Sequence, residues 1–94
     1  MALLFEWDPK KARRNREKQD VTFDEAGTAF RDTLSITIPD PLHSKEEERF
    51  ILLGCSYRNR LLVVVHIDRG DRIRIISARP ATQRERIRYE ENAE

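Results

Sequence analysis

The region from Arg49 to Ala78 restricts the fold more than any other part of the chain. It contains three runs rich in β-branched and aliphatic residues, at 49–56, 60–68 and 71–78, separated by connections of two or three residues. Connections this short allow antiparallel hairpins. Every residue from Leu61 to Val65 is apolar, so we expect this run to form the central strand, covered on both faces.

Two further strands are predicted nearer the N-terminus. Residues 3–7 are typical of a short strand, which the Asp8-Pro9 pair ends. Residues 34–38 alternate between apolar and small polar side chains, which predicts a half-buried strand ending at Pro39. The polar, acidic stretch 40–48 that follows is predicted to be a loop.

Three helices complete the predicted fold. Asp8 suits the N-cap of a polar helix over residues 10–19. Thr22 and Glu25 form a capping-box pattern, and an apolar stripe follows at Phe23, Ala26, Ala29 and Phe30. A second such pattern, Thr82 to Glu85, begins a polar C-terminal helix. The order of elements predicts one α+β domain over residues 1–94, with an antiparallel sheet of four strands besides the short N-terminal one.

Composition excludes several classes of function. Basic and acidic residues nearly balance at 18 and 17, but 14 of the basic residues are arginine, whose planar donor groups suit phosphate and carboxylate. Cys55 is alone in the sequence, so no internal disulfide can form, and we expect it to be an inert thiol in an apolar run. His66, in a valine-rich strand, is expected to be a sheet histidine rather than a general base. No spacing indicates a metal site, a cofactor, a signal peptide or a membrane span, and we expect a cytoplasmic protein.

The arginines of residues 71–79 are the most informative polar feature. Strand alternation places Arg72 and Arg74 on one face and Ile73 and Ile75 on the other, with Arg79 at the strand end. Such a cationic patch suits phosphate binding, and the basic helix 10–19 could add contacts to the same ligand. The alternative is a solvent-facing surface whose arginines pair with the acidic loop residues 46–48. From the pattern alone, the chain is a nucleic-acid-binding or protein-binding domain.

Several segments taken together resemble the BrnT toxin family. They are Phe5-Glu6-Trp7-Asp8, Lys11-Ala12, Asn15, Val21, Phe23, Ala26, Phe30-Arg31-Asp32, Glu47-Glu48-Arg49-Phe50, Gly54, Arg74-Ile75-Ile76-Ser77-Ala78-Arg79, Glu85-Arg86 and Tyr89-Glu90. The resemblance implies a RelE-like fold and a ribonuclease toxin of a type II toxin–antitoxin system. It also implies a BrnA-like ribbon-helix-helix antitoxin that binds operator DNA as a complex with the toxin.

The activity that the resemblance implies is cleavage of RNA without a metal, by attack of a ribose 2′-hydroxyl on the adjacent phosphate. We assign stabilisation of the developing charge to Arg74 and Arg79, and a further cation or the acid to Lys18. Glu48 is the candidate base or orienting carboxylate. We expect the antitoxin to cover the arginine face or the terminal helix with acidic and apolar residues.

One departure from the family pattern leaves a second hypothesis open. The family has His-Gly after the lysine, whereas this chain has Gln19-Asp20, and glutamine cannot transfer a proton near neutral pH. The alternative to an active ribonuclease is therefore a weak or inactive relative that binds the antitoxin and acts as a co-repressor.

Overall fold

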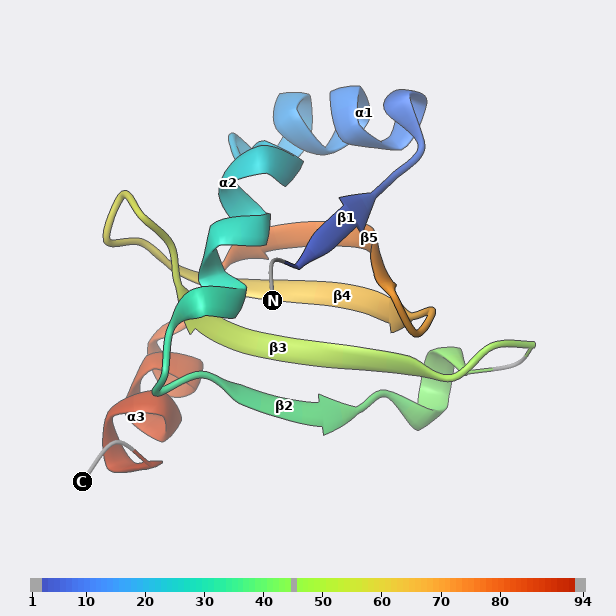
Figure 1. Ribbon diagram of the computed structural model, residues 1–94. Coiled ribbons are helices and arrows are strands. Elements are labelled where there is room, and N and C mark those ends of the chain that lie inside the picture. The colour runs from blue at the N-terminus through green and yellow to red at the C-terminus, as the bar shows by residue number, and fades with distance from the viewer. Residues whose placement is uncertain (1–2, 45, 93–94) are drawn as a thin grey trace.

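The computed structural model describes residues 3–44 and 46–92, and its elements follow the predicted order (Figure 1). The N-terminal part contains β1 (Leu4–Glu6), α1 (Pro9–Gln19), α2 (Phe23–Thr28), the 3-10 turn η1 (Ala29–Arg31), β2 (Ile36–Pro39) and the 3-10 turn η2 (Pro41–His43). The rest contains β3 (Arg49–Cys55), β4 (Leu61–Asp68), β5 (Arg72–Pro80) and α3 (Gln83–Asn92). The α+β prediction is confirmed, with element ends shifted by a few residues.

The strands form one sheet in the order β1-β5-β4-β3-β2, so β4 is central as its uninterrupted apolar run predicts. Strands β2 to β5 are antiparallel to their neighbours, whereas β1 pairs parallel to β5. The complete sheet is therefore mixed, because the chain leaves β1, passes through two helices and three strands, and returns beside it. Local pattern contains no signal for this pairing.

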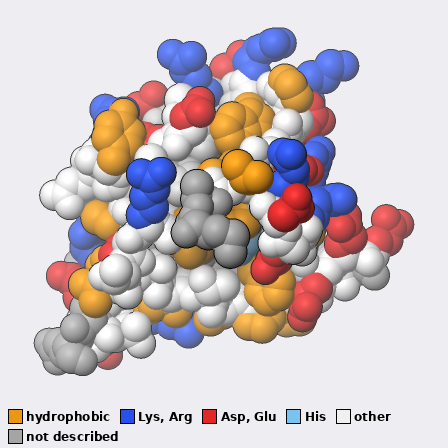
Figure 2. Space-filling model, in the orientation of Figure 1, with side chains coloured by type: hydrophobic (Ala, Val, Ile, Leu, Met, Phe, Trp, Pro, Cys, Tyr) orange, Lys and Arg blue, Asp and Glu red, His pale blue; other side chains and the backbone are white. Residues whose placement is uncertain are grey.

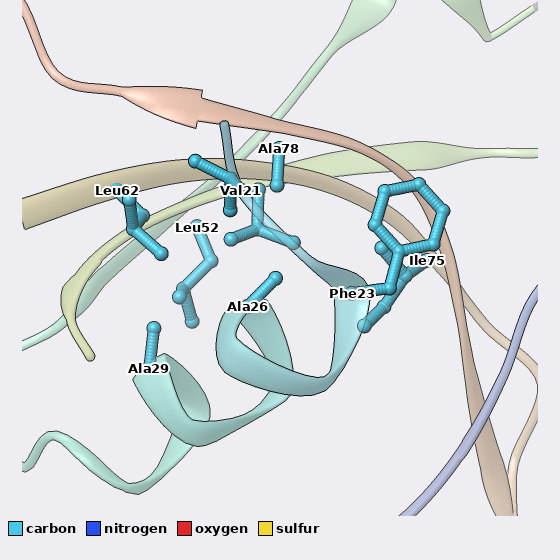
Figure 3. Close-up of a cluster of buried hydrophobic side chains, with 9 residues drawn as sticks. Val21, Phe23, Ala26, Ala29, Leu52, Leu62, Ile75 and Ala78 are labelled. Carbon is cyan, nitrogen blue, oxygen red and sulfur yellow. The ribbon is translucent and has the colours of Figure 1, made fainter. Parts of the chain in front are cut away.

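One face of the sheet, which we call the covered face, packs against α1, α2 and η1 and holds the main core. Ala26 and Ala29 approach the sheet here, and Phe23 packs beside Ile75 (Figure 3). Trp7 meets the Phe23 ring edge-on at 5.9 Å between centroids, so it is a packing residue. The buried members of this cluster are Val21, Phe23, Ala26, Ala29, Leu52, Leu62, Val64, Ile75 and Ala78.

The helix starts agree with the sequence in part. Asp8 accepts a hydrogen bond from the Lys10 amide at 2.9 Å, and Thr22 accepts one from the Glu25 amide at 3.1 Å. The Glu25 carboxylate was expected to reach back toward Thr22, but its hydrogen bonds go to Ser56 and Arg60 instead. The Arg60 guanidinium carries a full positive charge, which a backbone amide lacks, so it is the stronger partner for this buried carboxylate.

Asn15 ties α1 to the sheet. Strand β1 ends opposite Arg74, so the outer edge of β5 beyond that point has no neighbouring strand. The Asn15 side chain accepts a hydrogen bond from the Ala78 amide at 3.1 Å and donates one to the Ala78 carbonyl at 2.9 Å. One amide side chain thus replaces a strand at this edge and sets the position of α1.

The opposite face, which we call the open face, carries Ile51, Val63, Val65, Ile67 and the β5 arginines. Helix α3 lies at one end of it, where Tyr89 packs against the cluster of Leu53, Leu61 and Val63. The Tyr89 hydroxyl donates to Asp32 at 2.5 Å and so attaches α3 to the loop before β2. No described helix has the length and apolar character that crossing a membrane requires.

Candidate functional site

A β-bulge places the two candidate arginines of β5 on the same face of the sheet. Regular alternation would put Arg74 and Arg79 on opposite faces, because five positions separate them. The pairing between β4 and β5 shifts at Val65–His66, which leaves Ile76 as the extra residue. Arg74 then lies opposite Ile67 and Arg79 opposite Val63, and these two β4 residues share the open face.

Arg74 belongs to a row that crosses the sheet. Glu6, Arg74, Ile67 and Arg49 are direct partners on β1, β5, β4 and β3, so their side chains leave the sheet on one side. Arg74 donates to the Glu6 carboxylate at 3.0 Å, and both side chains are about one-third exposed, at 32% and 29%. Solvent and ligands can therefore reach this ion pair.

A further arginine approaches the same carboxylate. Arg69, in the turn between β4 and β5, lies 3.8 Å from the Glu6 carboxylate and donates to Glu47 at 3.1 Å. Glu6 is thus shared by two guanidinium groups. The backbone of Arg49 lies two strand spacings, or about 10 Å, from that of Arg74. Arg49, Arg69 and Arg74 thus bring three guanidinium groups to this end of the open face, and their donors suit a phosphodiester. Carboxylates lie among them, with Glu6 and Glu47 as the paired ones.

Arg79 has a different environment. Its guanidinium donates two parallel hydrogen bonds to Glu85 in α3, at 2.8 and 2.9 Å. The hydrogen bond from Arg79 lowers the pKa of Glu85 to about 2, and the same bond raises the pKa of Arg79. The Arg79 side chain therefore attaches the start of α3 to β5, and it is still 43% exposed.

The remaining candidates from the sequence lie apart from these arginines. Lys18 is on α1 and lines a hollow of about 250 Å³ with Gln19 and Ile76, on the α1 side of β5. Basic side chains gather over this helix in Figure 2. Glu48 is exposed and precedes Arg49, at the end of the sheet near Arg74 and far from Arg79. The structure thus does not bring Lys18, Glu48, Arg74 and Arg79 together around one point.

The alternative prediction, that the β5 arginines pair with the acidic loop residues 46–48, is wrong about their partners. Arg74 and Arg79 are paired, but with Glu6 and Glu85. Among the described residues, the ion pair between the 46–48 segment and β4–β5 is the one from Glu47 to Arg69. Sequence proximity cannot reveal such partners, because the two glutamates come from β1 and α3.

A second hollow, of about 320 Å³, adjoins the Arg74 row. It is lined by Leu42, His43, Glu46, Glu47, Arg49 and Ile67, and the last two residues belong to the row itself. His43 Nδ1 lies 2.9 Å from the Asp40 carboxylate, whose side chain is only 9% exposed, whereas the His43 side chain is 65% exposed. Sequence reasoning missed this pair, although the spacing of three residues could have suggested it.

Two further residues with reactive side chains lie on opposite faces of the sheet, His66 on the covered face and Cys55 beside Leu61 on the open face. His66 is 5% exposed and lies between the rings of Phe30 and Phe50, and its burial lowers its pKa. The prediction of a sheet histidine is therefore confirmed. Cys55 is half-buried with its sulfur 3.5 Å from Asn59. Within residues 3–44 and 46–92, no group of three or more His, Cys, Asp or Glu side chains could hold a metal ion.

Comparisons with known proteins found a matching family and a similar fold. The family model for the ribonuclease toxin BrnT of type II toxin–antitoxin systems matches residues 7–85. A crystal structure of the Brucella abortus ribonuclease toxin BrnT is similar in fold, with a TM-score of 0.67 and 20% sequence identity over 87% of this chain and 100% of that one. Comparison with curated proteins gave no match.

Proposed function

The chain belongs to the BrnT family of ribonuclease toxins of type II toxin–antitoxin systems, and from this premise we propose that it cleaves RNA on the open face of its sheet. The observation that carries the proposal is the row Glu6, Arg74, Ile67, Arg49 with Arg69 beside it. This arrangement brings partly exposed guanidinium groups together where an extended RNA strand can approach. In the cell, such a toxin acts in the cytoplasm, on RNA and together with its antitoxin.

The proposed reaction needs no metal ion from the protein. A ribose 2′-oxygen attacks the adjacent phosphorus, and the bond from phosphorus to the 5′-oxygen breaks, which leaves a 2′,3′-cyclic phosphate and a 5′-hydroxyl. Negative charge grows on the phosphoryl oxygens during the attack, and fixed guanidinium donors stabilise it. Arg74 supplies these donors by exchanging its exposed bond to Glu6 for bonds to the phosphate.

Arg74 and Arg79, the two candidate arginines of β5, then have different tasks. Arg74 and Arg79 are about 15 Å apart along the strand, so they contact different phosphates of one RNA strand. Arg74 acts at the cleaved phosphate and Arg79 at a flanking one. Lys18, on the α1 side of β5, binds the RNA backbone away from the cleaved bond, and Glu48 remains the carboxylate candidate for orientation or proton transfer beside Arg49.

The test is cleavage of a long unstructured RNA in EDTA by the wild type and by Arg74→Ala, Arg79→Ala and the double variant. Arg31→Ala, an exposed arginine on the covered side, is the matched control. We expect Arg74→Ala to lower kcat about 100-fold or more, as removal of a single charge-stabilising donor does. Arg79→Ala should mainly raise KM, and Arg31→Ala should cleave like the wild type.

The cleavage products decide between mechanisms. Ends with 2′,3′-cyclic phosphate support attack by the 2′-hydroxyl, and RNA with a single 2′-deoxyribose at the cleaved position should then resist cleavage. Loss of wild-type activity in EDTA would overturn the metal-independent mechanism. Folded wild type that cleaves nothing in either condition would favour the co-repressor function, for which Gln19 is the motivating residue, and Gln19→His is the variant to test next.

We further propose that a BrnA-like ribbon-helix-helix antitoxin neutralises the toxin by covering the open face, and that operator DNA is bound only through this complex. Half-buried Ile38, Ile51 and Val65 lie in register beside Ser77 on this face, so apolar side chains adjoin the arginines. An antitoxin segment with acidic and apolar residues matches such a surface. Charge reversal at Arg74 and Arg79 should weaken antitoxin binding at least 10-fold in titration calorimetry, and unchanged affinity would overturn this placement.

A further inference from the structure

We propose that His43, held by Asp40, transfers the proton of the attacking 2′-hydroxyl. This inference rests on the proposed ribonuclease function and assigns the base, for which Glu48 was the candidate from the sequence. At the hollow beside the Arg74 row, the exposed imidazole of His43 lies close to the buried carboxylate of Asp40 and to Arg49 of the row.

The local structure fixes the imidazole. The Asp40 amide donates to the Arg49 carbonyl at 2.8 Å, and the Ser44 hydroxyl donates to the Asp40 carbonyl at 2.6 Å while accepting from the Arg49 amide at 2.8 Å. These bonds attach the 40–44 segment to the start of β3. His43 is therefore positioned by the sheet and not by a free loop.

Asp40 determines which ring nitrogen is available. Its carboxylate is almost fully buried and accepts a hydrogen bond from Nδ1 of His43, which fixes the proton on that nitrogen. Nε2 then carries the lone pair and can accept a proton. A carboxylate placed behind an imidazole in this way also stabilises the imidazolium that forms.

His43 lies on the same side of the sheet as the charge-stabilising arginines, close to one of them. His43 and Arg49 line the same hollow, and Arg49 is two strands from Arg74 in the same row. A ribose in the hollow can therefore have its 3′-phosphate over the row. Glu48 is exposed and has no comparable orienting partner among its hydrogen bonds in the described residues, which favours His43 over Glu48 as the base.

The proton balance of the step is simple. Nε2 of His43 takes the proton from the 2′-hydroxyl as the 2′-oxygen bonds to phosphorus, and the departing 5′-oxygen takes a proton from water. The imidazolium then returns its proton to the hydroxide that results. The charged groups facing His43 are Asp40 on its own segment, Glu46 and Glu47 on the following one, and Arg49 on β3.

The experiment measures the pH dependence of cleavage by the full chain, using wild type, His43→Gln, Asp40→Asn and Arg74→Ala. Because a protonated base cannot accept the 2′-hydroxyl proton, the wild-type rate should fall on the acidic side of its pH profile. His43→Gln keeps a side-chain amide that can bond Asp40, and it should lower kcat about 100-fold or more and abolish this acidic limb. RNA affinity should change less than 3-fold, and thermal unfolding reports whether the variant is folded.

The other two variants separate proton transfer from positioning. Arg74→Ala should lower the rate equally at every pH and keep the acidic limb, because it leaves the imidazole in place. Asp40→Asn should shift the limb, as expected of a positioning residue. If the wild type cleaves RNA and His43→Gln retains both rate and acidic limb, the inference is wrong and the proposed function stands. A wild type without activity overturns both.

Discussion

Two glutamate–arginine clusters on opposite sides of the same sheet have opposite properties. Glu25 on α2 is 3% exposed and binds Arg60, Ser56 and, at 3.7 Å, Arg58. Glu6 on the open face is 29% exposed and is shared by Arg74 and Arg69. The first cluster is closed to solvent on the carboxylate side, so no ligand can replace its partners, whereas the second can exchange a carboxylate for a phosphate.

The difference shows how the fold separates stability from function. On the covered side, Arg60 also donates to the Asp20 carbonyl at 2.9 Å, so one guanidinium connects the end of α1, the start of α2 and the β3–β4 turn. The hydrogen bond from Arg60 lowers the pKa of Glu25 despite burial. A buried charge with all its partners stabilises one arrangement, and an exposed pair contributes little stability but remains available for binding.

The largest expected effect tests this contrast directly. Glu25→Ala leaves Arg60 without its buried partner and should lower the free energy of unfolding by about 3–5 kcal/mol in urea titrations. Glu6→Ala removes an exposed pair and should cost less than about 1 kcal/mol. Equal costs for the two substitutions would contradict the division between a structural and a functional cluster.

The attachment of α3 to the open face should have a smaller effect. Burial and the hydrogen bond to Asp32 raise the pKa of Tyr89 to about 12 from 10.0. Because the folded pKa is the higher one, the stabilisation is complete below pH 10 and is lost as pH rises toward 12. Tyr89→Phe should cost about 1 kcal/mol at neutral pH, with the difference from wild type disappearing toward pH 12. A difference that persists at high pH would show that packing, rather than the hydroxyl, attaches α3.

The pair between Arg79 and Glu85 predicts sensitivity to acid on the open face. The folded pKa of Glu85 is about 2 against an ordinary 4.5, so its stabilisation is present above pH 4.5 and is lost as pH falls toward 2. Glu85→Gln should therefore be less stable than wild type at neutral pH by under about 1 kcal/mol, since both side chains are partly exposed, and equally stable near pH 2. The same variant frees Arg79 and should bind RNA more tightly, whereas weaker binding would place Glu85 in the RNA site.

The smallest effect concerns the end of α1. Asp20 caps this helix in the left-handed conformation, with φ 56° and ψ 36°, which glycine adopts without strain. Asp20→Gly should raise the unfolding free energy by about 0.5 kcal/mol in thermal and urea unfolding. Asp20→Ala is the matched control and should be no more stable than wild type, because alanine is strained at this φ. The left-handed cap also explains the glycine that the family has here.

The sequence by itself determined the elements that depend on local pattern. The apolar run 61–65 gave the central strand, Asp8 and Thr22 marked helix starts, and short connections gave the hairpins of β3, β4 and β5. Periodicity and capping are local properties, so neighbouring residues are enough to predict them. The candidate arginines were also visible, because their residue type alone indicates phosphate chemistry.

The tertiary structure decided which side chains meet. The bulge at Ile76 places Arg79 on the same face as Arg74, although alternation predicts opposite faces. The parallel pairing of β1 supplies Glu6, and the packing of the 40–44 segment on β3 supplies the oriented His43. These contacts join residues whose attraction depends on the rest of the sheet being formed. The partners of Arg74 and Arg79 were therefore not predictable from local sequence, whereas the spacing of Asp40 and His43 could have suggested their contact.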